Sequence, residues 1–244
     1  MLNKFRGVTP DVIILIVLVA ILVWMGAFLH PVPQPAPDFS LRPMPLYNLL
    51  LSVIGFNPTV NVVAAFLLLL LTAFLLVNFN TSVFFIGERT FLPALIYILF
   101  SGLFPEQQQM NPVLPAAVFF IMALRKIIDS YKIQGTAYIL YDAGFLMSIG
   151  SLFYANFIWF VILLFIGIAQ LRPVNLKEIV ISMLGLATPW FLVSGFYYVT
   201  EKNWLNFRVW WKFNWFEKES FYVFSGVALP FLLLSGMTLI FSFA

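Results

Sequence analysis

The sequence predicts an all-α protein, a bundle of about eight transmembrane helices in a single domain covering residues 1–244. Hydrophobic residues make up 62% of the chain and charged residues 9%, whereas a soluble domain has about 45–50% apolar and about 25% charged residues. The mean hydropathy is +0.99, although a soluble fold needs polar residues to cover its surface. The apolar residues also gather in runs long enough to cross a bilayer.

Eight apolar runs account for this prediction. The first, residues 12–29, is interpreted as a retained span: its apolar run exceeds the roughly 7–15 residues of a signal peptide, and no small-x-small cleavage site follows. The other spans are predicted at 59–79, 89–104, 113–128, 136–152, 153–171, 176–198 and 221–243. Counts of seven or nine spans stay open because the third and fifth runs are short.

Two segments between the spans have distinct compositions. Prolines at positions 31, 33, 35 and 37 exclude a helix after the first span and favour an extended strip. Residues 46–56 are apolar but too short to span, so they predict an interfacial helix. The sequence therefore predicts a surface strip followed by a helix in the membrane plane.

The distribution of basic residues predicts that both termini are cytoplasmic. With eight spans, the cytoplasmic side would hold Lys4, Arg6, Arg89, Arg125, Lys126, Lys132, Arg172 and Lys177. The outer side would hold Arg42, Lys202, Arg208, Lys212 and Lys218. We predict a location in the bacterial inner membrane.

Composition also excludes several classes of function. The chain has no cysteine, which excludes disulfides, thiolate metal sites and cysteine nucleophiles. A net charge of +3 does not indicate nucleic acid as a partner. The two halves do not resemble each other as inverted-repeat transporters do.

Polar residues collect in the predicted outer loops. They are His30, Asp38 and Arg42 after the first span, Glu106, Gln107, Gln108, Gln109 and Asn111 after the third, and Glu201, Lys202, Arg208 and Lys212 after the seventh. Such a set can hold a phosphate-linked substrate while a carboxylate accepts a proton. Ordinary solvated loops would look the same. A divalent cation on Asp38 and Glu106 is an open alternative, whereas one histidine gives little support for zinc.

The loop at 200–219 contains an aromatic and basic stretch. Its tryptophans are Trp204, Trp210, Trp211 and Trp215, interleaved with Arg208 and Lys212. Aromatic rings favour the headgroup level and basic groups attract anionic headgroups. The stretch is interpreted as an interfacial anchor, or as a platform for a lipid phosphate.

Asp142 is the one acid within an apolar stretch. Ionisable groups at membrane depth are costly and indicate function by default. The equally weighted alternative is a structural acid paired with a neighbouring cation, for which Arg125 and Lys126 are within reach. Gly144, Ser148 and Gly150 of the same run predict close helix packing.

The order of these features resembles the GT-C superfamily of membrane glycosyltransferases, and small bacterial membrane proteins that look like reduced relatives of it. The resemblance covers residues 12–198. It rests on the acid-bearing loop and short helix after the first span, Gly87-Glu-Arg89, the short helices around Phe104-Pro-Glu106, the run from Asp142 to Tyr154, and Arg172. It implies a base at Asp38 and, at Glu106, a second acid that holds the donor, often through a metal.

We therefore expect a glycosyltransferase-like protein that uses a polyprenyl-phosphate-linked sugar at the outer face. Asp38 would be the base, Glu106 and Gln107 the donor contacts, and Arg42, Lys202 and Arg208 the phosphate contacts. Its partners would be membrane lipid and that sugar carrier. The alternative is a non-catalytic subunit of a cell-envelope complex of the secretion or motility type, with other membrane subunits as partners.

Overall fold

The computed structural model describes residues 10–31, 43–55, 57–83, 90–103, 108–132, 137–171 and 176–201. All regular structure in this part of the chain is helical, as predicted. The elements are α1 (Pro10–Leu29), α2 (Pro45–Ile54), α3 (Pro58–Val83), α4 (Leu92–Ser101), α5 (Val113–Lys132), α6 (Ala137–Phe153), the 3-10 helix η3 (Ala155–Phe160), α7 (Val161–Leu171) and α8 (Leu176–Glu201). The predicted span at 221–243 lies outside the described residues.

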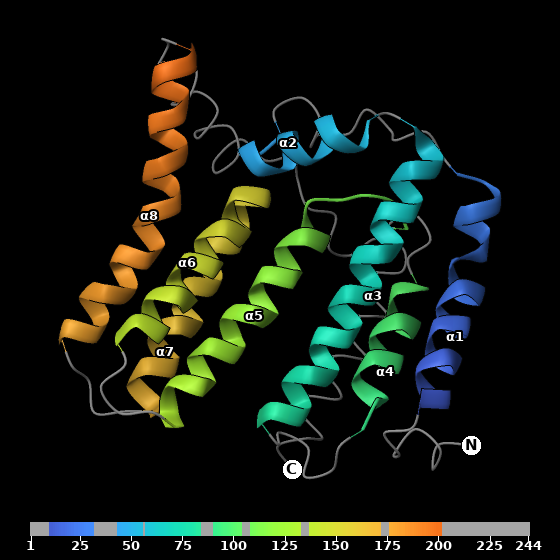
Figure 1. Ribbon diagram of the computed structural model, residues 1–244, viewed down its shortest axis with the longest axis horizontal. Helices are drawn as coiled ribbons and strands as arrows, with labels where there is room; N and C mark the ends of the chain where they lie inside the picture. Colours follow the sequence, from blue (N-terminus) through green and yellow to red (C-terminus); the bar gives the residue numbers. More distant parts are fainter. Residues whose placement is uncertain are drawn as a thin grey trace, which may run out of the picture.

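The helices form a bundle with α2 lying across one end (Figure 1). Neighbouring helices pack in the order α8, α6, α5, α3 and α1, with α4 against both α1 and α3 and α7 against α5. We call the end where α2 lies the α2 end. The opposite end, where α5 is joined to α6, is called the Asp142 end.

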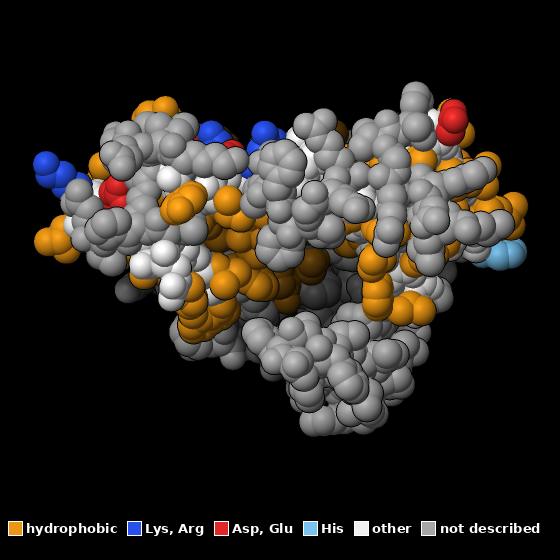
Figure 2. Space-filling model, turned by 90° about the horizontal axis from the view of Figure 1, so that it is seen from below, with side chains coloured by type: hydrophobic (Ala, Val, Ile, Leu, Met, Phe, Trp, Pro, Cys, Tyr) orange, Lys and Arg blue, Asp and Glu red, His pale blue; other side chains and the backbone are white. Residues whose placement is uncertain are grey.

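Three described helices contain stretches long and apolar enough to cross a membrane: Asp11–Leu29, Pro58–Thr81 and Leu176–Thr200. Large apolar side chains also face outward, among them Ile14 (67% exposed), Leu22 (58%) and Phe191 (77%). Seen from the Asp142 end, the charged side chains of the described residues form a few spots near the edges, and hydrophobic side chains form larger areas (Figure 2). Soluble monomers rarely expose so much contiguous apolar surface, so these surfaces are those of a membrane protein.

Asparagine–proline pairs mark where α3 and α5 begin. Asn57 Oδ1 accepts from the Thr59 amide at 3.1 Å, next to Pro58 at the first helical position of α3. Asn111 Oδ1 accepts in the same way from the amides of Val113 and Leu114 at the start of α5. These contacts satisfy amides that have no partner within the helix.

A single stripe of α1 faces the bundle. Val12, Ile16, Ala20 and Trp24 are buried at intervals of four residues, which places them on one face of a helix. The Trp24 ring lies 5.7 Å from that of Phe66 on α3. The remaining faces of α1 are exposed and apolar, as expected for a helix that contacts lipid.

Glycines permit a close crossing between α6 and α8. A Cβ added at Gly144 would lie 2.5 Å from the Ser182 carbonyl oxygen, and one added at Gly185 would overlap the Tyr141 carbonyl oxygen. The Trp190 indole also donates to Ser151 Oγ at 3.0 Å across this interface. The packing role predicted for Gly144 is therefore seen against α8.

One predicted span is shorter than expected, and two other predicted features are found close to their predicted positions. The helix of the third run is α4, only ten residues long, which rises about 15 Å against the roughly 30 Å of the hydrocarbon core. The chain leaves α6 at Tyr154, whose φ of −137° and ψ of 110° are extended, before η3 begins. The predicted helix at 46–56 is found as α2, Pro45–Ile54.

Candidate functional site

The candidate site at the α2 end is built from contacts between α1, α2 and the segment that leads into α5. The Tyr47 hydroxyl on α2 donates to the Met110 carbonyl oxygen at 3.1 Å. Gln108 Nε2 donates to the Val23 carbonyl oxygen on α1 at 3.3 Å. Tyr47, Gln108 and Met110 are buried. These contacts hold residues 108–110 against both helices that bracket the segment 32–42.

A second polar contact joins α1 to α4. Trp24 Nε1 donates to Ser101 Oγ at 3.2 Å, and Ser101 donates in turn to the Ile98 carbonyl oxygen at 2.7 Å. Ser101 is the last residue of α4, five positions before Glu106. Both sides of the short segment that contains Glu106 are thus attached to α1.

The side chain of Asn61, close to the α2 end of α3, makes no hydrogen bond to another described residue. The residue is 2% exposed, and neither Oδ1 nor Nδ2 has a hydrogen-bond partner. Val62 beside it belongs to the same buried cluster as Tyr47 and Met110. Unpaired buried amide groups each cost about 1–3 kcal/mol, so Asn61 is an unusual residue to keep at this position for stability alone.

Most of the predicted site residues fall in segments outside the described part of the chain. These are Asp38, Arg42, Glu106, Gln107, Lys202, Trp204, Arg208, Trp210, Trp211 and Trp215. Their roles stay predictions. His30 is described and is exposed, just past the end of α1.

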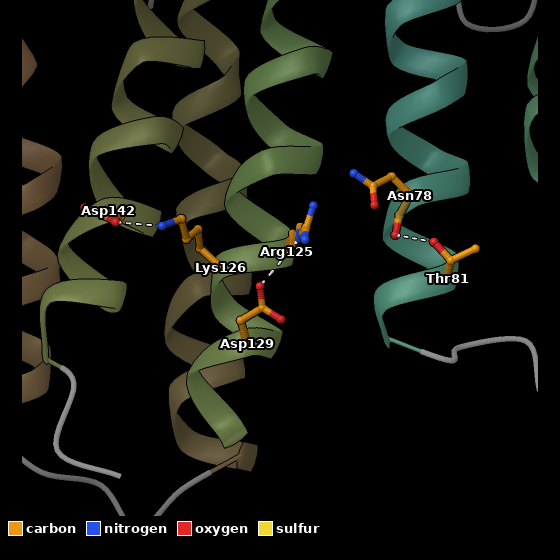
Figure 3. Close-up of polar contacts among 6 residues, drawn as sticks. All are labelled: Asn78, Thr81, Arg125, Lys126, Asp129 and Asp142. Carbon is orange, nitrogen blue, oxygen red and sulfur yellow. Dashed lines mark hydrogen bonds and ion pairs between the residues drawn. The ribbon is translucent and has the colours of Figure 1, made fainter. Parts of the chain in front are cut away.

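Asp142 is paired with a cation. Lys126 Nζ on α5 lies 2.8 Å from Asp142 Oδ2 on α6, and both side chains are 41% exposed. Figure 3 shows Lys126 reaching from α5 toward Asp142 at the Asp142 end. The pair neutralises an acid that would otherwise be costly between apolar helices, which favours the structural interpretation of Asp142.

A longer ion pair lies one residue away on α5. Arg125 Nε lies 3.6 Å from Asp129 Oδ2, in an i,i+4 pair. Figure 3 shows Arg125 on the side of α5 that faces α3, where Asn78 and Thr81 lie. At 3.6 Å this contact is an ion pair and not a hydrogen bond, so the guanidinium keeps most of its donors.

Among the residues that the structure describes, no three His, Asp or Glu side chains gather as a metal site requires. The predicted cation contacts, Asp38 and Glu106, stand outside those residues. The chemistry that we propose below needs only their carboxylates.

Comparison of the chain with protein-family models, with curated proteins and with solved structures finds no match. We therefore infer function from the arrangement of the residues.

Sequence reasoning overlooked Tyr47 and Asn61. Tyr47 stands in a helix predicted only as interfacial, and a pairing with a carbonyl 63 positions away leaves no sequence signal. Asn61 could have been found, because it is a polar residue in the first turns of an apolar run.

Proposed function

We propose that this chain is a glycosyltransferase-like integral membrane protein that uses a polyprenyl-phosphate-linked sugar at the outer face of a bacterial inner membrane. The supporting observation is the docking of residues 108–110 on α1 and α2 through Gln108 and Tyr47. Glu106 stands two residues before Gln108, a stretch that spans about 7 Å at most. Asp38 stands in the segment that connects α1 to α2. Both acids thus stand in the sequence between described residues that lie toward the α2 end.

The proposed reaction is the transfer of a sugar to a hydroxyl group. The acceptor oxygen forms a bond to the anomeric carbon while the bond from that carbon to the phosphate oxygen breaks. The electron pair leaves with the polyprenyl phosphate, and the Asp38 carboxylate accepts the hydroxyl proton. Glu106 and Gln107 would hold the donor, and Arg42, Lys202 and Arg208 would stabilise the phosphate charge.

Asn61 supports a polar ligand at the α2 end. A primary amide has one acceptor and two donor hydrogens, which suit adjacent sugar hydroxyls. A buried amide without protein partners is explained if a ligand supplies them. The Asn61 side chain is therefore a candidate contact for the sugar donor, in addition to the predicted contact Gln107.

We further propose eight passages of the chain between the two faces, the third of them built on the short helix α4, with both termini cytoplasmic and the α2 end outside. Two observations support this orientation. The C-terminal end of α1 and the N-terminal end of α3 lie at the α2 end, and the C-terminal end of α5 lies at the Asp142 end (Figure 1). Arg125 and Lys126 lie toward the Asp142 end (Figure 3), and basic residues favour the cytoplasmic side.

A transfer assay tests the catalytic proposal. Washed membranes from cells that lack the gene would be supplied with the purified protein and a radiolabelled polyprenyl-phosphate hexose. We expect label to move to a membrane acceptor, and Asp38→Asn to lower the rate by at least about 100-fold, as loss of a general base does. Asp11→Asn, an exposed acid at the other end of α1, is the matched control and should keep the rate.

The subunit alternative predicts the opposite outcome. If Asp38→Asn and Glu106→Gln both support every phenotype of the wild-type gene, and if no hexose donor labels the membranes, the protein is not a transferase. Copurification of the wild-type chain with other membrane subunits would then establish a structural role.

A further inference from the structure

The guanidinium of Arg125 keeps donors that no described contact uses. Among the described residues, its ion pair joins Nε to Asp129 at 3.6 Å, and the side chain is 43% exposed. The next residue, Lys126, is paired instead with Asp142 at 2.8 Å. Figure 3 shows the far end of Arg125 turned away from Asp129 toward α3. The terminal nitrogens are therefore available to an external acceptor.

A second donor faces Arg125 from α3. The Asn78 side chain is exposed and points toward Arg125 in Figure 3. The Thr81 hydroxyl is occupied, because it donates to the Asn78 carbonyl oxygen at 3.0 Å. Since α3 and α5 pack against each other, a guanidinium and an amide on two neighbouring helices point toward one another (Figure 3).

This pair of donors lies near the end of the stretch of α3 that is long and apolar enough to cross a membrane. The apolar stretch of α3 that can cross a membrane ends at Thr81, three residues after Asn78. Lipid phosphates lie at the border of the hydrocarbon region, where basic groups between transmembrane helices bind headgroups. The guanidinium fork fits phosphate oxygens better than an ammonium group does.

We propose that Arg125 and Asn78 bind the phosphate of a membrane lipid at the Asp142 end, between α3 and α5. This site is separate from the proposed transferase site, which lies at the α2 end. Asp129 competes with the lipid phosphate for Arg125. The matching ligand is the phosphate of an anionic phospholipid or of a polyprenyl phosphate.

Lipid titration of the full-length protein in detergent micelles tests the proposal. Phosphatidylglycerol should raise the unfolding temperature at lower concentrations than phosphatidylcholine. Arg125→Gln should increase the concentration of phosphatidylglycerol needed by about fivefold, the loss expected for one basic group at a membrane surface. Asp129→Asn should lower that concentration, because it removes the competing carboxylate.

The two substitutions separate a lipid site from a purely structural ion pair. Arg125→Gln and Asp129→Asn would break a purely structural ion pair equally. If both variants change the required phosphatidylglycerol concentration equally and in the same direction, the proposal is overturned. Asn78→Leu leaves the ion pair intact and should also weaken binding; an unchanged titration would contradict a role for Asn78. Titration with a polyprenyl phosphate identifies the source: a lower midpoint than for phosphatidylglycerol assigns the site to the carrier lipid, and a higher one to phospholipid.

Discussion

Gly185→Ala is expected to lower the free energy of unfolding by about 3 kcal/mol, the upper range for overpacking. The added methyl group would overlap the Tyr141 carbonyl oxygen and lie 3.0 Å from the carbonyl carbon and 3.1 Å from the Phe145 nitrogen. All three atoms are backbone, so no side chain can rotate away. Relief requires α8 to move off α6, and α6 is its main packing partner among the described helices.

Gly195→Ala on the same helix is the matched control. Nothing lies within 4 Å of a Cβ built at Gly195, and alanine favours a helix over glycine by up to about 1 kcal/mol. We expect this variant to be as stable as the wild type or more stable. Thermal unfolding followed by circular dichroism in one detergent compares the two variants, and equal losses would contradict a close α6–α8 crossing.

Single substitutions of the Lys126–Asp142 pair are expected to cost about 1–2 kcal/mol each. This range lies between the free-energy losses measured for exposed ion pairs and for buried ones, because both side chains are partly exposed. Lys126→Met leaves an uncompensated carboxylate between apolar helices, and Asp142→Leu leaves an uncompensated ammonium. The double variant removes both charges and should regain most of the stability.

A double-mutant cycle measures this coupling by unfolding in detergent. Additive losses in the double variant would show that the two side chains do not act as a pair. Normal stability of the double variant together with loss of a cellular phenotype would instead assign Asp142 a role in function.

The helices were predictable because their signals are local. Asn57-Pro58 and Asn111-Pro112 mark the starts of α3 and α5, and the apolar run of α1 needs no tertiary information. Asp142 was identified from its charge in an apolar run, and Lys126 was one of two cations placed within its reach. Such inferences depend on composition and helical spacing alone.

Contacts between distant segments were not predictable. The pairing of Tyr47 with Met110, and of Gln108 with Val23, depends on how α1, α2 and α5 pack, which no single run of residues encodes. The third run was expected to be short, but an apolar run does not show where helical hydrogen bonding stops, and α4 is only ten residues long. The break after α6 was predicted to within about two residues, because spans were expected at 136–152 and 153–171 and the chain leaves the helix at Tyr154.

Cysteine crosslinking tests the central claim, that Asp38 and Glu106 meet at the outer face. The chain has no native cysteine, so an Asp38→Cys/Glu106→Cys variant reports only on that pair. A short bismaleimide that cannot cross membranes would be added to intact cells, and crosslinking detected by mass spectrometry of peptides. Lys126→Cys/Asp142→Cys is the control, because this pair is in contact at the Asp142 end. We predict that the first pair is crosslinked in intact cells and the control only after the membrane is opened. The account is contradicted if the first pair fails to crosslink even in opened membranes in which the control pair does.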